Sequence, residues 1–84
     1  MSKKKQWVVY IIETESGRLY TGITNDIARR FEEHASGKKG AKFFHLSKPV
    51  RILFQELHED RASASRREAE IKKLPRALKL NLCA

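Results

Sequence analysis

The chain has 84 residues, 18 Lys and Arg against 10 Asp and Glu, and a formal net charge of +8. Domains rarely fall much below ~50 residues, so this length excludes a two-domain architecture. We expect one domain over 1–84, with a core at about 7–74 and a basic tail at 1–6. The single cysteine, Cys83, excludes a disulfide framework and fits a reducing cytoplasm, where we place the protein. No run approaches the ~18 apolar residues of a membrane span, so we expect no membrane partner.

The positive charge is clustered. The segment 38–51 contains basic residues and no acid, namely Lys38, Lys39, Lys42, Lys48 and Arg51. Such a segment is typical of a polyanion partner, because each neutralised phosphate releases condensed counterions. We therefore predict a nucleic-acid interface at Lys38, Lys39, Lys42 and Lys48. The alternative is that the charge serves solubility alone.

The first third of the chain predicts an antiparallel hairpin. Residues 7–12 are β-branched and aromatic throughout, the composition of a strand covered on both faces. The polar residues 13–18 have turn chemistry, and residues 19–23 form a second strand. Gly22 within that strand indicates either a bulge or the close approach of another group.

A helix is predicted next, capped by a residue of 24–26 and ended by Gly37 in a left-handed conformation. Arg30 and His34 project from the flank of its apolar stripe, which consists of Ile27, Phe31 and Ala35. From periodicity alone, Arg30 is a solvated charge and His34 a partly buried packing residue.

The second half predicts a loop at 38–48, a third strand at 50–58 and another helix that runs to about Leu74. In the strand we expect Val50, Ile52 and Phe54 on one face and Leu53 and Leu57 on the other. The helix is expected to be capped by Asp60 or Ser63 and to carry the stripe Ala64, Ile71 and Leu74. Pro75 ends it, and the alternation of leucines in the tail fits a strand or, as we prefer, a short helix. The order β–β–α–β–α predicts an α+β fold with a small three-stranded antiparallel sheet flanked by helices.

Three further side chains need an explanation. Glu68 borders the stripe of the second helix, where a carboxylate is costly unless it meets a cation, a donor or a metal. An ion pair with Lys72 is the simpler interpretation, and Arg67 lies at least as close to the stripe. Tyr10 and Tyr20 sit one on each hairpin strand, where plain cross-strand packing would suffice.

Together these residues resemble the GIY-YIG nuclease domain. The resemblance covers about residues 7–74 and rests on an ordered set of motifs: Val8-Val9-Tyr10, Tyr20-Thr21-Gly22, the helix with Arg30 and His34, and Glu68 in a later helix. The amino-acid sequences of residues 20–24 and 70–74 are similar to those of small stand-alone bacterial members of this family. The first motif lacks the leading glycine and the isoleucine, and Thr21 replaces isoleucine in the second. Asn81 lies near the place where repair-type members carry an asparagine.

The resemblance implies hydrolysis of DNA phosphodiester bonds with one divalent metal ion, Mg²⁺ or Mn²⁺. Glu68 then matches the only protein ligand of the metal, and Arg30 matches the residue that binds the scissile phosphate. Tyr10 and Tyr20 match the motif tyrosines, one of which activates water while the other positions it. His34 matches a position near the phosphate.

The sequence is compatible with three candidate functions. The first is a metal-dependent endonuclease acting on nicked, branched or damaged DNA in repair or recombination, with room for a protein partner that supplies specificity. The alternative is a non-catalytic nucleic-acid-binding module that uses the same basic surface and is indifferent to Mg²⁺. The third is a partner-binding protein that uses an apolar patch around Leu78, Leu80 and Leu82.

Overall fold

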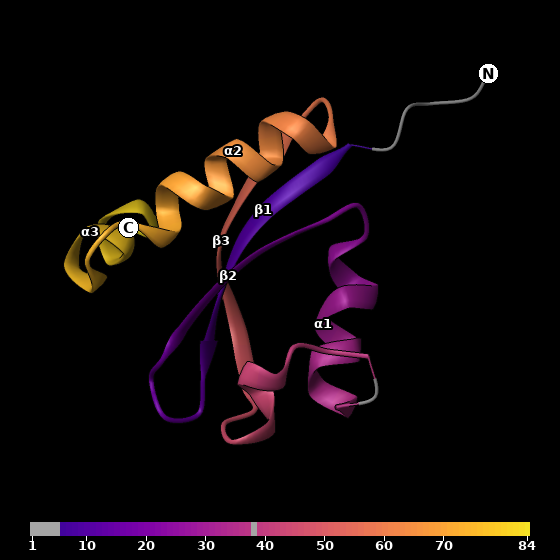
Figure 1. Cartoon of the computed structure of the whole chain (residues 1–84). Coiled ribbons are helices and arrows are strands. Elements are labelled where there is room, and N and C mark those ends of the chain that lie inside the picture. Colours follow the sequence, from indigo (N-terminus) through magenta and orange to yellow (C-terminus); the bar gives the residue numbers. More distant parts are fainter. Residues whose placement is uncertain (1–5, 38) are drawn as a thin grey trace.

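A computed structural model of the chain describes residues 6–37 and 39–84. Its strands form one antiparallel sheet in the order β2-β1-β3, with α1 on one face and α2 and α3 on the other (Figure 1). The predicted α+β class is confirmed. The elements are β1 (Trp7–Thr14), β2 (Leu19–Thr24), α1 (Ile27–Ser36), the 3₁₀ helix η1 (Lys42–His45), β3 (Pro49–His58), α2 (Arg61–Lys72) and α3 (Arg76–Leu82).

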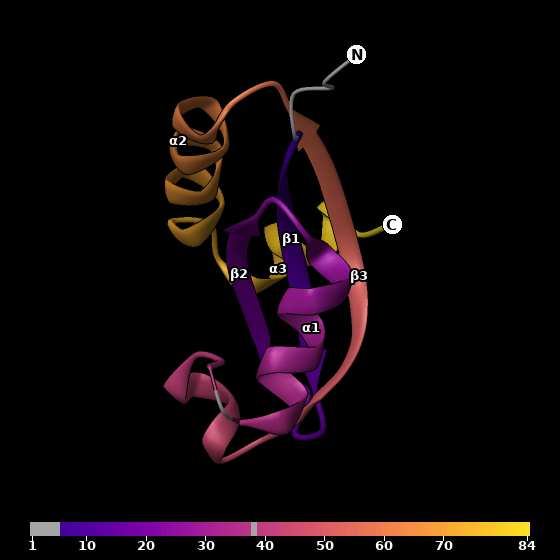
Figure 2. The ribbon, with the colours of Figure 1, turned by 90° about the vertical axis from the view of Figure 1, so that its right-hand side faces the viewer.

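The central strand β1 divides the core into two layers. Val8, Tyr10 and Ile12 face α1, whereas Val9 and Ile11 face α2, because successive side chains of a strand point to opposite faces. All five are at most 7% exposed, so the predicted double-sided burial of this strand is confirmed. Figure 2 shows β1 between its two neighbours, with β2 free at one edge of the sheet.

The expected alternation of β3 is wrong. In the pairing of β1 with β3, Ile11 lies opposite Phe54 and the next residue, Ile12, lies opposite Ile52. Leu53 is therefore left without a partner on β1. This bulge inserts one residue and turns the two side chains to opposite faces. Ile52 therefore packs in the layer of α1 and Phe54 in the layer of α2.

The helix limits follow local chemistry. Asp26 caps α1 by accepting from the Arg29 N–H (3.1 Å), and Gly37 ends it with φ 77°. Asp60 caps α2 by accepting from the Ser63 N–H (2.8 Å). Pro75 lies at the start of α3. The tail is helical over Arg76–Leu82, so the preferred prediction of a short helix is confirmed. Within the described ranges, no helix is both long and apolar enough to cross a bilayer.

The segment after α1 is more ordered than a plain loop. It contains η1, and Phe44 within η1 is 2% exposed. Its far end is tied to the β1–β2 turn, because Ser47 and Ser16 share a hydrogen bond between hydroxyls (2.8 Å) and the Glu15 N–H donates to the Lys48 carbonyl (2.9 Å). The segment thus has a fixed place beside β2.

A buried hydroxyl of β2 is left without a partner. Thr21 is 4% exposed, and its Oγ1 makes no hydrogen bond with any described residue. A buried unsatisfied hydroxyl costs roughly 1–3 kcal/mol. We expect Thr21→Val to raise the free energy of unfolding by about 1 kcal/mol, as measured by urea denaturation. Thr14→Val is the control: Thr14 is equally buried, but its hydroxyl accepts from the Arg18 N–H, so this change should destabilise the protein.

Candidate active site

The two motif tyrosines lie on the same face of the hairpin. Tyr10 on β1 pairs with Gly22 on β2. Tyr20 lies two residues before Gly22 on β2, so it is the diagonal neighbour of Tyr10. The two ring centroids are 6.2 Å apart. A Cβ at position 22 would lie 2.5 Å from the Tyr10 hydroxyl oxygen. Because the β1–β2 register is regular, the glycine serves close approach and not a bulge.

His34 is buried beneath Tyr10 and uses both ring nitrogens. Its Nδ1 accepts from the Ala41 N–H (3.1 Å), so the neutral ring carries its proton on Nε2. Nε2 is 3.0 Å from the Tyr10 hydroxyl oxygen and therefore donates to it. The hydroxyl proton of Tyr10 is consequently free to be donated elsewhere. His34 was expected as a packing residue, and it also sets the direction of this hydrogen bond.

Burial keeps both groups neutral. It lowers the pKa of His34 to about 4, and the nearby charge of Arg30 lowers it further against the opposing effect of Glu33. Burial also raises the pKa of Tyr10 well above its usual range, with a smaller contribution from Tyr20. Near pH 7, Tyr10 is thus a hydrogen-bond donor and not a base.

The buried neutral His34 predicts a pH dependence of stability. In the unfolded chain histidine titrates near pH ~6.5, whereas in the folded chain the pKa of His34 is about 4. Between these two pH values the unfolded chain binds a proton that the folded chain does not. The free energy of unfolding therefore has its full value above the unfolded pKa and falls as the pH drops toward 4. We expect a loss of about 1 kcal/mol per pH unit in urea titrations. His34→Gln should remove this component of the slope, and an identical slope in both proteins would contradict the assignment.

Arg30 lies at the junction of α1 and the following segment. Its Nη1 donates to the Glu33 carboxylate (3.0 Å) and to the Lys39 carbonyl (2.8 Å). Burial tends to lower the pKa of Arg30, but the bond to Glu33 and the interaction with the Tyr10 hydroxyl raise it overall. The guanidinium is therefore firmly charged and lies beside that hydroxyl. The guanidinium has five N–H donors, so donors remain for an anion beside these contacts.

Sequence reasoning missed the residues that hold this arrangement together. A Cβ on Gly40 would lie 2.5 Å from the Cα of His34, so only glycine lets the chain cross α1 this closely. The crossing brings the Ala41 N–H to the His34 ring. Phe44 then packs on His34 with ring centroids 4.3 Å apart, which anchors this segment in the core. The available signal was a glycine followed by apolar residues inside a basic loop.

Glu68 lies on α2 and influences Tyr10 through its charge. Its side chain is 22% exposed and pairs with Lys72 (3.3 Å), as the simpler interpretation expected. Its negative charge is among the influences that raise the pKa of Tyr10, which sets it near the site. The neighbouring side chain, Arg67, extends instead toward β3, where its guanidinium pairs with the Glu56 carboxylate (3.1 Å). The side chains of these two neighbouring residues therefore have different partners.

The remaining sequence candidates lie around this cluster. Lys38 lies outside the described residues, Lys39 and Lys42 are exposed, and the Nζ of Lys48 is 3.5 Å from the Ala35 carbonyl oxygen. Asn81 is exposed on α3, and within the described part of the chain no contact joins it to the tyrosines, Arg30 or Glu68. No group of three or more His, Cys, Asp and Glu that could hold a metal is present in residues 6–37 and 39–84.

The chain matches a known family over most of its length. The family model for the GIY-YIG catalytic domain matches residues 6–81. The chain belongs to the GIY-YIG family. The predicted resemblance is thereby confirmed over nearly the whole chain.

Relatives in the GIY-YIG family are small bacterial proteins. The chain is 42% identical to a UPF0213 protein of Cupriavidus pinatubonensis, over 100% of this chain and 92% of that protein. It is 44% identical to a UPF0213 protein of Cupriavidus necator, over 100% of this chain and 90% of that one. The solution structure of a UPF0213 protein from Bacillus halodurans matches with a TM-score of 0.57 and 40% identity, covering 92% of this chain and 81% of that one.

Proposed function

We propose that this GIY-YIG protein is a metal-dependent endonuclease that hydrolyses DNA phosphodiester bonds, acting on nicked, branched or damaged DNA in repair or recombination. One observation carries the proposal. The buried Tyr10 hydroxyl is hydrogen-bonded to His34 (3.0 Å), and the charges of Arg30, from the same helix as His34, and of Glu68, from α2, both influence its pKa. A pure binding site for phosphate gains nothing from a nearby carboxylate, because the two repel unless a cation intervenes.

Glu68 fits a single Mg²⁺ or Mn²⁺ ion. Magnesium prefers oxygen ligands, keeps several of its waters and needs only one or two carboxylates. The partner of Glu68, Lys72, is 53% exposed and can turn into solvent when a metal binds. A bound metal would act as Lewis acid on a phosphoryl oxygen and lower the pKa of bound water.

The other side chains have separate roles in this proposal. Arg30 binds the scissile phosphate through the free arms of its guanidinium and stabilises the charge that develops there. Tyr10, kept protonated by burial and already accepting from His34, donates its proton in a hydrogen bond to the phosphate or to the attacking water. His34 positions Tyr10 and does not transfer a proton.

Tyr20 is the remaining candidate for activating water. Within residues 6–37 and 39–84 its hydroxyl has no hydrogen-bond partner. A tyrosine can accept a proton from water only in its ionised form, and nearby positive charge favours that form. Arg30 and a metal at Glu68 would supply this charge. Lys39, Lys42 and Lys48 remain the proposed contacts to flanking DNA.

A cleavage assay tests the proposal. Supercoiled plasmid and synthetic nicked and branched DNA are incubated with the protein in Mg²⁺, in Mn²⁺ and in EDTA, and products are resolved by gel. We expect cleavage with either metal and none in EDTA. Binding without cleavage under every condition would overturn the proposal in favour of the non-catalytic binding module.

A further inference from the structure

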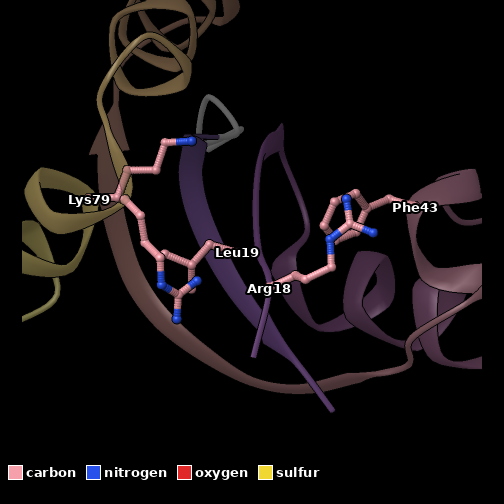
Figure 3. A pocket seen from close by; sticks show the side chains of 5 residues that line it. Arg18, Leu19, Phe43 and Lys79 are labelled. Carbon is pink, nitrogen blue, oxygen red and sulfur yellow. The ribbon is translucent and has the colours of Figure 1, made fainter. Parts of the chain in front are cut away.

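A second cationic site lies at one end of the free edge of β2. It is a pocket of about 220 Å³ lined by Arg18, Leu19, Phe43, Arg76 and Lys79. Figure 3 shows Arg18 and Phe43 on one side, Lys79 from α3 on the other, and Leu19 between them. The lining thus joins the start of β2, η1 and α3, elements that lie on different faces of the sheet.

Packing holds the cations in place. The guanidinium carbon of Arg18 lies 4.5 Å from the centroid of the Phe43 ring, a cation–π contact that fixes its direction. The helix that carries Arg76 and Lys79 is anchored by Leu82, which packs in the same layer as Leu19. The three charges are therefore brought together by the tertiary structure.

None of these three cations is neutralised. In the described part of the chain Arg18, Arg76 and Lys79 form no ion pair, although Arg30, Arg51, Arg67 and Lys72 each pair with a glutamate. No acidic residue lines the pocket. Three like charges around a small concavity repel one another and so favour an anion between them.

The pocket is next to the candidate active site. The rings of Phe43 and Tyr20 are in contact, with centroids 5.3 Å apart. A nucleic-acid strand that lies over Tyr20 along the edge of β2 would therefore reach the pocket with a neighbouring nucleotide. Leu19 and Phe43 offer apolar surface to a sugar, and the cations offer donors to its phosphate.

We propose that this pocket is a phosphate-binding subsite that holds the nucleic-acid strand beside the active site. The position of the strand over the candidate active site rests on the proposed function. The binding of a phosphate in the pocket does not. It adds Arg18, Arg76 and Lys79 to the interface, none of which is in the basic loop that the sequence indicated.

Binding in the absence of metal tests the subsite. A fluorescein-labelled dT12 oligonucleotide is titrated in EDTA, and affinity is measured by anisotropy at several salt concentrations. The variant Arg76→Gln/Lys79→Gln is compared with Arg66→Gln/Lys73→Gln, which removes the same charge from exposed positions on and just after α2. Circular dichroism confirms that both remain folded.

We expect the pocket variant to bind about 10-fold more weakly than wild type, and the control to lose less than about 2-fold. The slope of log K against log salt should become shallower by about 1.4, roughly 0.7 for each lost phosphate contact on a single strand. Equal losses in the two variants would overturn the subsite, since they would show only the effect of net charge.

Chemical-shift mapping gives an independent readout. In a titration of ¹⁵N-labelled wild type with the same dT12, the amides of Arg18, Leu19 and 76–79 should shift at the lowest oligonucleotide concentrations. Shifts confined to 39–48 would overturn the subsite. The two proposals fail separately: a protein that binds here but never cleaves loses only the nuclease function, and a nuclease whose pocket variant binds like the control loses only the subsite.

Discussion

Glu68→Gln is expected to abolish metal-dependent cleavage, with a loss of about 10³-fold or more. Glutamine keeps the size of the side chain and removes the charge that would hold the cation. Neutralising position 68 also removes a repulsive charge beside the phosphate, so DNA affinity in EDTA should be unchanged or higher. Single-turnover cleavage and anisotropy on the same DNA measure the two effects.

The matched control for this change is Glu70→Gln. Glu70 is on the same helix and has the same charge, but its side chain is 67% exposed and pairs with Arg67. We expect cleavage within about 2-fold of wild type, since an exposed pair contributes little. If Glu68→Gln still cleaved like Glu70→Gln, the metal would have to be held elsewhere.

Arg30→Lys is the second large effect, a loss of about 10²–10³-fold in the cleavage step. Lysine keeps the positive charge but presents a single ammonium in place of a planar fork. It cannot hold Glu33 and the Lys39 carbonyl through one nitrogen while presenting others to a phosphate. The cleavage rate at saturating protein should fall much more than DNA affinity, because total charge is preserved.

Arg29→Lys controls for the substitution itself. Arg29 precedes Arg30 on α1 and is exposed. Its backbone N–H donates to the Asp26 cap, and among residues 6–37 and 39–84 its side chain has no hydrogen bond or ion pair. It should cleave like wild type, and thermal denaturation shows whether either variant has lost its fold. A comparable loss in both variants would mean that the Arg30 fork is not required.

Much of this fold could be predicted because its signals are local. The apolar run of β1 identified a strand buried on both faces. Gly37 marked one helix end, and the cap candidates at 24–26 and at Asp60 or Ser63 marked two helix starts, of which the structure uses Asp26 and Asp60. The order of motifs also pointed to the candidate residues Tyr10, Tyr20, Arg30, His34 and Glu68. Each of these inferences depended only on nearby residues or on the order of elements.

Other features depended on distant parts of the chain. The bulge at Leu53 arises from pairing with β1, so the pattern of β3 alone placed Ile52 and Phe54 on the same face. Likewise, the spacing of α1 showed that His34 lies near the buried stripe, but not that Ala41 and Tyr10 occupy its two nitrogens.

The order of elements, the net positive charge and the residue types available for chemistry can all be read from the amino-acid sequence. Which side chains meet depends on the packing of the folded chain. It separated Glu68 from Arg67, fixed the proton on His34 Nε2, and gathered Arg18, Arg76 and Lys79 around one pocket. The physical reason is that periodicity defines which face of an element is buried, whereas the packing of elements far apart in the chain defines what that face touches.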